Sequence, residues 1–150
     1  MKRLLVLCTH NSARSQMGEG WLRKLAWEAG LEAEIWSAGS EKTLVKPEAV
    51  QVMAEIGIDL SGHWSKTAQE VPDGASIDAT ITVGGEPHES CPLFPGATRH
   101  YHVALADPSG HDLERWRESR EQVGRVMKVF IDELKAGRWP TAESLRQVTG

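Results

Sequence analysis

The residues best suited to covalent chemistry are Cys8 and Arg14, which stand six positions apart near the start of the chain. A cysteine thiolate is a nucleophile, and the planar guanidinium of an arginine can hold two oxygens of one anion. The residues around them are small or polar: Thr9, His10, Asn11, Ser12, Ala13 and Ser15. A loop of such residues can present consecutive backbone N–H groups to a tetrahedral oxyanion. We therefore expect residues 9–15 to bind an oxyanion that Arg14 holds and Cys8 attacks.

A reaction that removes an oxygen from such an anion needs a proton donor. Asp107, in the stretch ALADPSGHD, follows the strand-like segment TRHYHV at 98–103. The carboxyl ends of parallel strands meet at one edge of a sheet, so Asp107 is expected beside Cys8 and Arg14 as the acid. The other cysteine, Cys91, stands in the loop-like stretch 84–97 and is either a second reactive thiol or an unrelated one.

Apolar patterns predict the elements that must position these residues. Strand-like runs cover residues 3–7, 33–39, 77–83 and 98–103, and helical stripes cover about 14–29, 47–56 and 113–136, with a short final helix after residue 140. Strands that alternate with helices are typical of a parallel sheet. We predict one α/β domain, residues 1–150, with a four-stranded parallel sheet and helices on both faces.

Composition and charge narrow the range of partners. The chain has 150 residues, with 17 Lys and Arg against 21 Asp and Glu, and a net charge of -4. This balance offers no electrostatic attraction for nucleic acid or for an anionic membrane. No apolar run approaches the ~20 residues of a membrane-spanning helix. The two cysteines form neither a CxxC pair nor a zinc-like cluster. We expect a cytoplasmic monomer with no bound metal and no tightly bound cofactor.

These motifs together resemble the low-molecular-weight tyrosine phosphatase superfamily, and more closely the thioredoxin-coupled arsenate reductases built on that fold. The resemblance covers about residues 3–136. It rests on VLCTHNSARSQM, SAG at 37–39, VKPEAVQVMAEIGIDLSGHWSK at 45–66, CPLFPG at 91–96 and ADPSG at 106–110. The phosphatases usually have a proline directly after the Arg-Ser pair and a tyrosine soon after the Asp-Pro. Here Gln16 and Ser109 stand in those places, which favours the reductases.

The resemblance implies that Cys8 attacks arsenate and that Asp107 assists loss of water or hydroxide. A second cysteine then displaces arsenite and forms a disulfide, and thioredoxin or another thiol donor supplies the reducing equivalents. Cys91 matches the later cysteine of the family's redox loop. Gly84 stands where the earlier one is expected. Resolution by Cys91 and resolution by an external thiol therefore both stay open.

Two other functions are compatible with the same residues. A phosphotyrosine-type phosphatase would cleave phosphate monoesters through a phosphocysteine and needs only Cys8, Arg14 and Asp107. A non-catalytic oxyanion or metal binder would use the histidines and the second cysteine in the later part of the chain: His88, Cys91, His100, His102 and His111.

Overall fold

The computed structural model describes residues 2–71, 77–84 and 96–149. The strands are β1 (Lys2–Cys8), β2 (Ala33–Gly39), β3 (Ala79–Val83) and β4 (Arg99–Val103). The helices are α1 (Arg14–Glu28), α2 (Pro47–Ala54), α3 (Leu113–Lys135) and α4 (Ala142–Gln147), with a short 3₁₀ helix, η1 (Ala68–Glu70). All four predicted strands and all four predicted helices are present, with bounds within about two residues of the expected ones.

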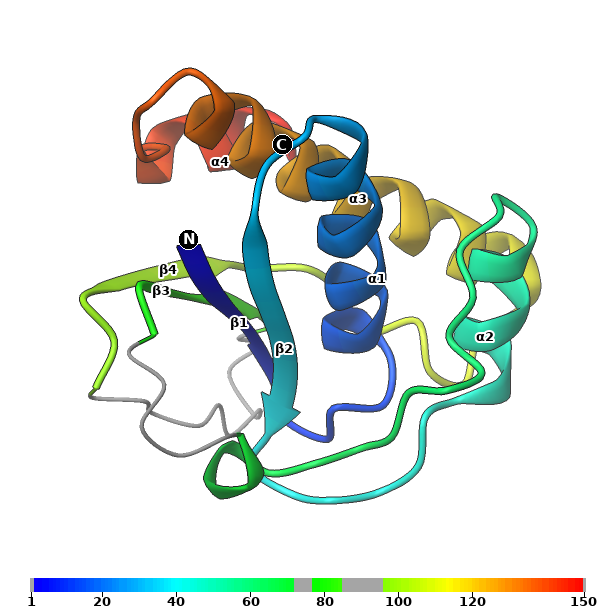
Figure 1. Cartoon of the computed structure of the whole chain (residues 1–150). Helices are drawn as coiled ribbons and strands as arrows, with labels where there is room; N and C mark the ends of the chain where they lie inside the picture. Colours follow the sequence, from blue (N-terminus) through cyan, green and yellow to red (C-terminus); the bar gives the residue numbers. More distant parts are fainter. Residues whose placement is uncertain (1, 72–76, 85–95, 150) are drawn as a thin grey trace.

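The four strands form one parallel sheet in the order β2-β1-β3-β4. Cys8, the last residue of β1, is paired in register with Gly39, the last residue of β2. The carboxyl ends of the strands therefore meet at one edge of the sheet (Figure 1). The segments that follow β1, β2 and β4 all start from this edge, as a site built from residues 9–15 and Asp107 requires.

Alternate residues of β1 belong to two separate apolar clusters. Leu4, Val6 and Cys8 pack in the larger cluster, to which α1, α2, α3 and α4 all contribute. Leu5 and Leu7 pack in the smaller cluster on the other face. Both faces of β1 are thus covered, which explains its continuous apolar run. Complete burial of each such side chain contributes about 1.5–3 kcal/mol to the free energy of unfolding.

The predicted fold class, a four-stranded parallel sheet with helices, is confirmed. In the described part of the chain the cover is uneven, because the four α-helices join one cluster while η1 packs beside the other. The short helix η1 was not predicted, because three residues are too few to show an apolar period. The pair Thr67 and Glu70, which forms a capping box, is the sequence feature that indicates the start of this helix. None of the described helices is long and apolar enough to span a membrane.

Candidate active site

The loop between β1 and α1 turns its carbonyl groups outward. Each carbonyl oxygen of residues 9–12 accepts a hydrogen bond from outside the loop or from α1. Thr9 O accepts from Ser40 N at 2.8 Å and from Glu41 N at 3.1 Å, and His10 O accepts from Ser65 Oγ at 2.9 Å. Asn11 O accepts from Gln16 Nε2 at 3.1 Å, and Ser12 O accepts from Lys46 N at 2.8 Å. In a trans peptide the N–H points opposite to the preceding carbonyl, and the described residues contain no cis peptide. The N–H groups of residues 10–13 therefore point to the inside of the loop, where they form a nest for an anion.

The start of α1 adds to this positive environment. Ala13 occupies the position before the helix and offers no capping side chain, and the first turn carries no acidic residue. The partial positive charge of the helix N-terminus is therefore left facing the loop. An anion held there is stabilised by the helix as well as by the nest.

Cys8 lies at the base of this loop, where its side chain is 3% exposed. Its Sγ is 2.7 Å from Ser15 Oγ, and Ser15 Oγ also accepts a hydrogen bond from Asn11 Nδ2 at 2.9 Å. Since the hydroxyl of Ser15 accepts from Asn11, its own proton is available to the sulfur. The Ser15 hydroxyl is thus placed to donate to the sulfur of Cys8, as it would in the attack of a thiolate on a bound anion.

Asn11 holds the loop in its shape. It is fully buried and has a φ of 50°, in the left-handed region that asparagine tolerates better than most residues. Its Oδ1 accepts from Lys66 N and from Gln16 Nε2, both at 2.9 Å. Gln16 Nε2 also donates to the carbonyl of Trp64. The other end of this amide, Gln16 Oε1, lies 2.9 Å from His63 Nδ1. Because an amide oxygen can only accept, His63 Nδ1 is the donor of this hydrogen bond. The loop is thereby tied to residues 63–66.

Gly39 allows β2 to end directly against the loop. A Cβ at this position would lie 2.6 Å from Thr9 O and 2.8 Å from Asn11 N. Both distances are shorter than the contacts that Cβ atoms make with backbone oxygen or nitrogen in folded proteins. In the sequence Gly39 stands out only as the last residue of the SAG motif at 37–39, with no role of its own. The requirement for glycine comes from a chain segment about 30 residues earlier, which no local pattern reveals.

Arg14 and Asp107 come together at the mouth of the loop. Arg14 is 4% exposed, and its Nη1 donates to Leu105 O at 2.7 Å. Its Nη2 is 3.8 Å from Asp107 Oδ2. The two side chains therefore lie close together, as predicted, because the segment after β4 starts from the edge of the sheet where β1 ends.

The charge of Asp107 is set by its neighbours. Partial burial acts to raise the pKa of Asp107, but hydrogen bonds from Ser109 and the positive charge of Arg14 outweigh it, so the pKa lies below its ordinary value. One of these bonds runs from Ser109 N to Asp107 Oδ1 at 3.0 Å. Asp107 is therefore a carboxylate at neutral pH.

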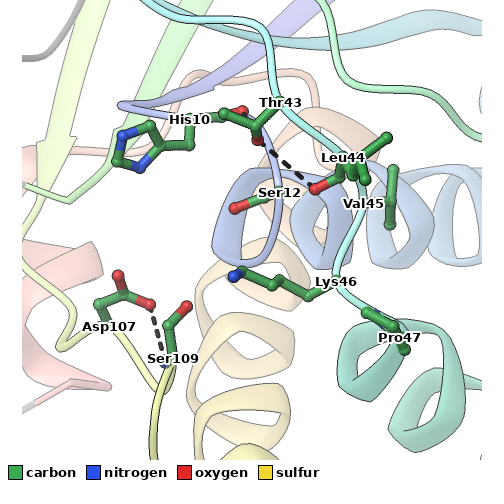
Figure 2. A pocket seen from close by; sticks show the side chains of 9 residues that line it. All are labelled: His10, Ser12, Thr43, Leu44, Val45, Lys46, Pro47, Asp107 and Ser109. Atoms are coloured by element: carbon green, nitrogen blue, oxygen red, sulfur yellow. Dashed lines mark hydrogen bonds between the residues drawn. The ribbon is translucent and has the colours of Figure 1, made fainter.

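A cavity of about 590 Å³ opens in front of the loop (Figure 2). It is lined by residues from three segments: His10, Ser12, Thr43, Leu44, Val45, Lys46, Pro47, Asp107 and Ser109. The segment 43–47 was not predicted to take part in the site. Pro47 could have indicated it, because a proline favours the first turn of a helix. A helix that starts at this edge of the sheet brings the residues before it to the site.

A buried ionic cluster lies behind the loop. Glu19, on α1, is 5% exposed and accepts hydrogen bonds from Ser37 Oγ at 2.6 Å and from Arg23 Nε at 3.0 Å. Lys66 Nζ is 3.9 Å and His63 Nδ1 is 3.8 Å from its carboxylate oxygens. No local sequence pattern indicates this cluster, since its members come from distant segments.

Other predicted site residues are placed apart from this centre or are not described. Cys91 and His88 lie outside the described residues. His100 Nδ1 is 2.9 Å from Thr80 Oγ1, and His102 Nε2 is 2.9 Å from Gly84 O, so both rings take part in hydrogen bonds. Within residues 2–71, 77–84 and 96–149, no three His, Cys, Asp or Glu side chains are grouped as metal ligands.

Comparisons with known proteins place the chain among its relatives. Residues 3–139 match the family of low molecular weight phosphotyrosine protein phosphatases. An arsenate reductase of Halalkalibacterium halodurans is 39% identical over 141 residues, which cover 89% of this chain and 98% of that protein. Arsenate reductase 2 of Staphylococcus saprophyticus is 34% identical over 131 residues, 87% of this chain and 97% of that protein. The solved structure of an arsenate reductase in its phosphate-binding state superposes with a TM-score of 0.74 at 31% identity, over 91% of this chain and 98% of that one.

Proposed function

Because the chain belongs to the low molecular weight phosphotyrosine protein phosphatase family, we propose that it is an arsenate reductase whose nucleophile is Cys8. The observation that carries the proposal is the position of Cys8 Sγ, 2.7 Å from Ser15 Oγ and beneath a loop whose N–H groups point inward. The near full-length likeness to two arsenate reductases supports reduction over hydrolysis as the main activity.

In the first step arsenate binds in the loop, with two of its oxygens on Arg14. The Cys8 thiolate attacks arsenic, an S–As bond forms, and one As–O bond breaks. Asp107 takes up a proton when the anion binds beside it, because a neighbouring negative charge favours the neutral form of a carboxyl group. It then passes that proton to the departing oxygen, which leaves as water.

In the second step a further thiol attacks Cys8 Sγ. An S–S bond forms, the S–As bond breaks, and its electron pair stays on arsenic, which leaves as arsenite. Arsenic is reduced from the V to the III state, and two sulfurs are oxidised to a disulfide. We propose Cys91 or an external thiol as the attacking group, with thioredoxin or another thiol donor as the source of electrons and no tightly bound cofactor.

A phosphatase is the second candidate. The family to which the chain belongs is described by that activity, and the same three residues would form and hydrolyse a phosphocysteine. The cavity, with Leu44 and Val45 among its lining residues, has room for the organic group of a phosphate monoester.

Parallel assays separate the two functions. Arsenate with thioredoxin, thioredoxin reductase and NADPH should support NADPH oxidation, whereas an aryl phosphate should be hydrolysed slowly. Cys8→Ser should abolish both activities, because a serine hydroxyl at this site is a far weaker nucleophile than a thiolate. Absence of arsenate turnover beside rapid hydrolysis of the aryl phosphate would exclude the reductase. Survival of either activity in Cys8→Ser would exclude Cys8 as the nucleophile.

We further propose that the active species is a cytoplasmic monomer formed by one domain, residues 1–150. The family match over residues 3–139 supports the single domain. Sedimentation of the purified protein at micromolar concentration tests the monomer, and a mass of two chains would contradict it.

A further inference from the structure

Charged side chains of both signs surround the mouth of the anion loop. His10 Nε2 lies 3.1 Å from Glu41 Oε2, and Arg14 Nη2 lies 3.8 Å from Asp107 Oδ2. In each pair the carboxylate offsets positive charge that its partner could offer to an incoming anion. Among the described residues that line the cavity, Lys46 is the other cation. Lys46 therefore supplies positive charge at the mouth beyond that of the two pairs.

The side chain of Lys46 is exposed and lines the cavity. Figure 2 shows it running across the cavity in the direction of Asp107. The hydrogen bond from Lys46 N to Ser12 O at 2.8 Å fixes the backbone from which it extends. Lys46 is the residue before α2, but its side chain makes no capping hydrogen bond. Within the described part of the chain, no carboxylate lies within ion-pair distance of Lys46 Nζ, so the ammonium group is available to a ligand.

The cavity leads to the anion loop. His10 and Ser12 belong to the loop and also line the cavity, as does Asp107, whose carboxylate lies beside Arg14. A compact space of about 590 Å³ is about 8 Å across, which is close to the Debye length of about 8 Å at physiological ionic strength. An anion inside the cavity is therefore within the range over which Lys46 can attract it.

The rest of the molecule opposes the approach of an anion. The chain has a net charge of -4, and Asp107 places a carboxylate at the mouth. A local cation can outweigh such a background where apolar walls limit screening by water. Leu44 and Val45 supply apolar walls to this cavity. Lys46 is thus placed where one positive charge has a strong effect on anion binding.

We propose that Lys46 is a substrate-binding residue that attracts the oxyanion into the cavity and toward the anion loop, an inference that rests on the proposed function. Its ammonium group acts on the anion by charge and takes no part in bond breaking, which belongs to Cys8 and Asp107. Loss of this charge should therefore weaken the binding of arsenate and phosphate and leave kcat unchanged. Because the side chain is exposed, salt should screen the attraction.

Lys42 provides a matched control on the same segment. It is also exposed, but its Nζ pairs with Glu70 Oε1 at 3.1 Å, and it is not among the residues that line the cavity. Lys42→Gln and Lys46→Gln remove the same charge from the chain. A difference between these two variants therefore reports the position of Lys46 and not the net charge of the protein.

Two measurements test the proposal in the parent protein and in Lys46→Gln, Lys46→Arg, Lys46→Glu and Lys42→Gln. Calorimetric titration with phosphate gives the anion affinity without any turnover. Arsenate reduction with thioredoxin, thioredoxin reductase and NADPH gives kcat and kcat/KM. Both are carried out at ionic strengths of about 0.02 M and about 0.5 M, between which the Debye length falls from roughly 20 Å to roughly 4 Å.

At the lower ionic strength, Lys46→Gln should decrease the phosphate affinity and the kcat/KM for arsenate about threefold to fivefold, the value of one exposed ion pair. At the higher ionic strength both losses should fall below about twofold. Lys46→Glu should decrease both quantities further, because it reverses the charge. Lys46→Arg keeps the charge and Lys42→Gln leaves the cavity unchanged, so both should resemble the parent protein.

Several outcomes would overturn the proposal. Equal losses in Lys46→Gln and Lys42→Gln, or a loss that persists at the higher ionic strength, would show that Lys46 does not attract the anion by its charge. A lower kcat with unchanged phosphate affinity would place Lys46 in the bond-breaking step instead. The expected changes in phosphate affinity without any arsenate turnover would support the role of Lys46 and exclude the reductase. A parent protein that bound no phosphate would exclude both.

Discussion

Asp107 places a negative charge at the mouth of the anion loop, beside Arg14. Its side chain is 40% exposed, it accepts a hydrogen bond from Ser109 N, and it lies 3.8 Å from Arg14 Nη2. These neighbours keep the pKa of Asp107 low despite its partial burial. The site therefore contains a carboxylate that repels an incoming anion and that must gain a proton before it can act as an acid.

Asp107→Asn should separate these two effects. The amide oxygen can still accept from Ser109 N, but the negative charge is lost. At pH 7 phosphate should bind about fivefold more tightly as a competitive inhibitor, because the repulsion is removed. The kcat for arsenate should fall at least about 100-fold, because the proton donor is lost. Inhibition and turnover assays measure both quantities.

The exposed Asp132→Asn on α3 is the matched control and should change neither quantity. Unchanged phosphate affinity in Asp107→Asn would contradict the charge effect, and unchanged kcat would contradict the role as acid.

At the scale of elements, the site depends on the parallel ends of β1 and β2. Cys8 and Gly39 are paired in register, and the loop after β1 passes so close to Gly39 that no side chain fits between them. The amide of Gly39 donates to Lys66 O at 2.8 Å, so the strand end also fixes the segment that supports Asn11. The shape of the anion loop is therefore a property of two strands and not of the loop alone.

Gly39→Ala tests this dependence. The added Cβ would lie 2.6 Å from Thr9 O, so the loop or the strand end has to move. We expect a loss of about 1–3 kcal/mol in the free energy of unfolding and a decrease of at least about tenfold in phosphate affinity. Urea unfolding and calorimetric titration measure the two effects.

Gly62→Ala serves as the comparison, because a Cβ there meets no atom within 4 Å. It should leave the free energy of unfolding within about 0.5 kcal/mol of the parent protein. If Gly39→Ala retained full affinity for phosphate, the proposed link between β2 and the loop would be wrong.

At the scale of the whole molecule, the buried cluster around Glu19 joins α1, β2 and residues 63–66. Burial lowers the pKa of His63, against the opposing charge of Glu19, and burial also lowers the pKa of Lys66. Glu19 accepts from Ser37 and pairs with Arg23, so its charge is compensated inside the protein. Loss of any one partner would leave a buried charge poorly compensated, which is costly.

The lowered pKa of His63 makes stability depend on pH. Between the folded pKa and the ordinary value of about 6.5, the unfolded chain binds a proton that the folded protein does not. The free energy of unfolding should therefore decrease as pH falls from 7.5 through about 6.5 toward the folded pKa, with a slope of up to about 1.4 kcal/mol per pH unit from this group.

His63→Gln should remove this contribution. Urea unfolding of the parent and the variant at several pH values between 5 and 8 measures the difference in slope. At pH 8 the histidine is neutral in both states, so any difference there reports lost contacts only. Parallel pH dependences in the two proteins would contradict the assignment of the slope to His63.

The elements and the local part of the site could be predicted from the order of the residues alone. The apolar runs defined the strands, the helical stripes defined the helices, and the topology of parallel sheets predicted that Asp107 would lie near Arg14. These features depend on residues close in sequence or on a rule that holds for the whole fold class.

Four features became visible only in the folded chain: the role of Gly39, the buried charges around Glu19, the place of Lys46 in the cavity and the hydrogen bond between Ser15 and Cys8. The first three depend on distances between segments more than ten residues apart, which packing sets and no local pattern encodes. The last depends on the place of the Ser15 hydroxyl group, which lies 2.9 Å from the buried amide of Asn11 and 2.7 Å from Cys8 Sγ. Residue types therefore predicted that Cys8 lies beside a loop that binds an anion, whereas packing determined which groups surround that loop.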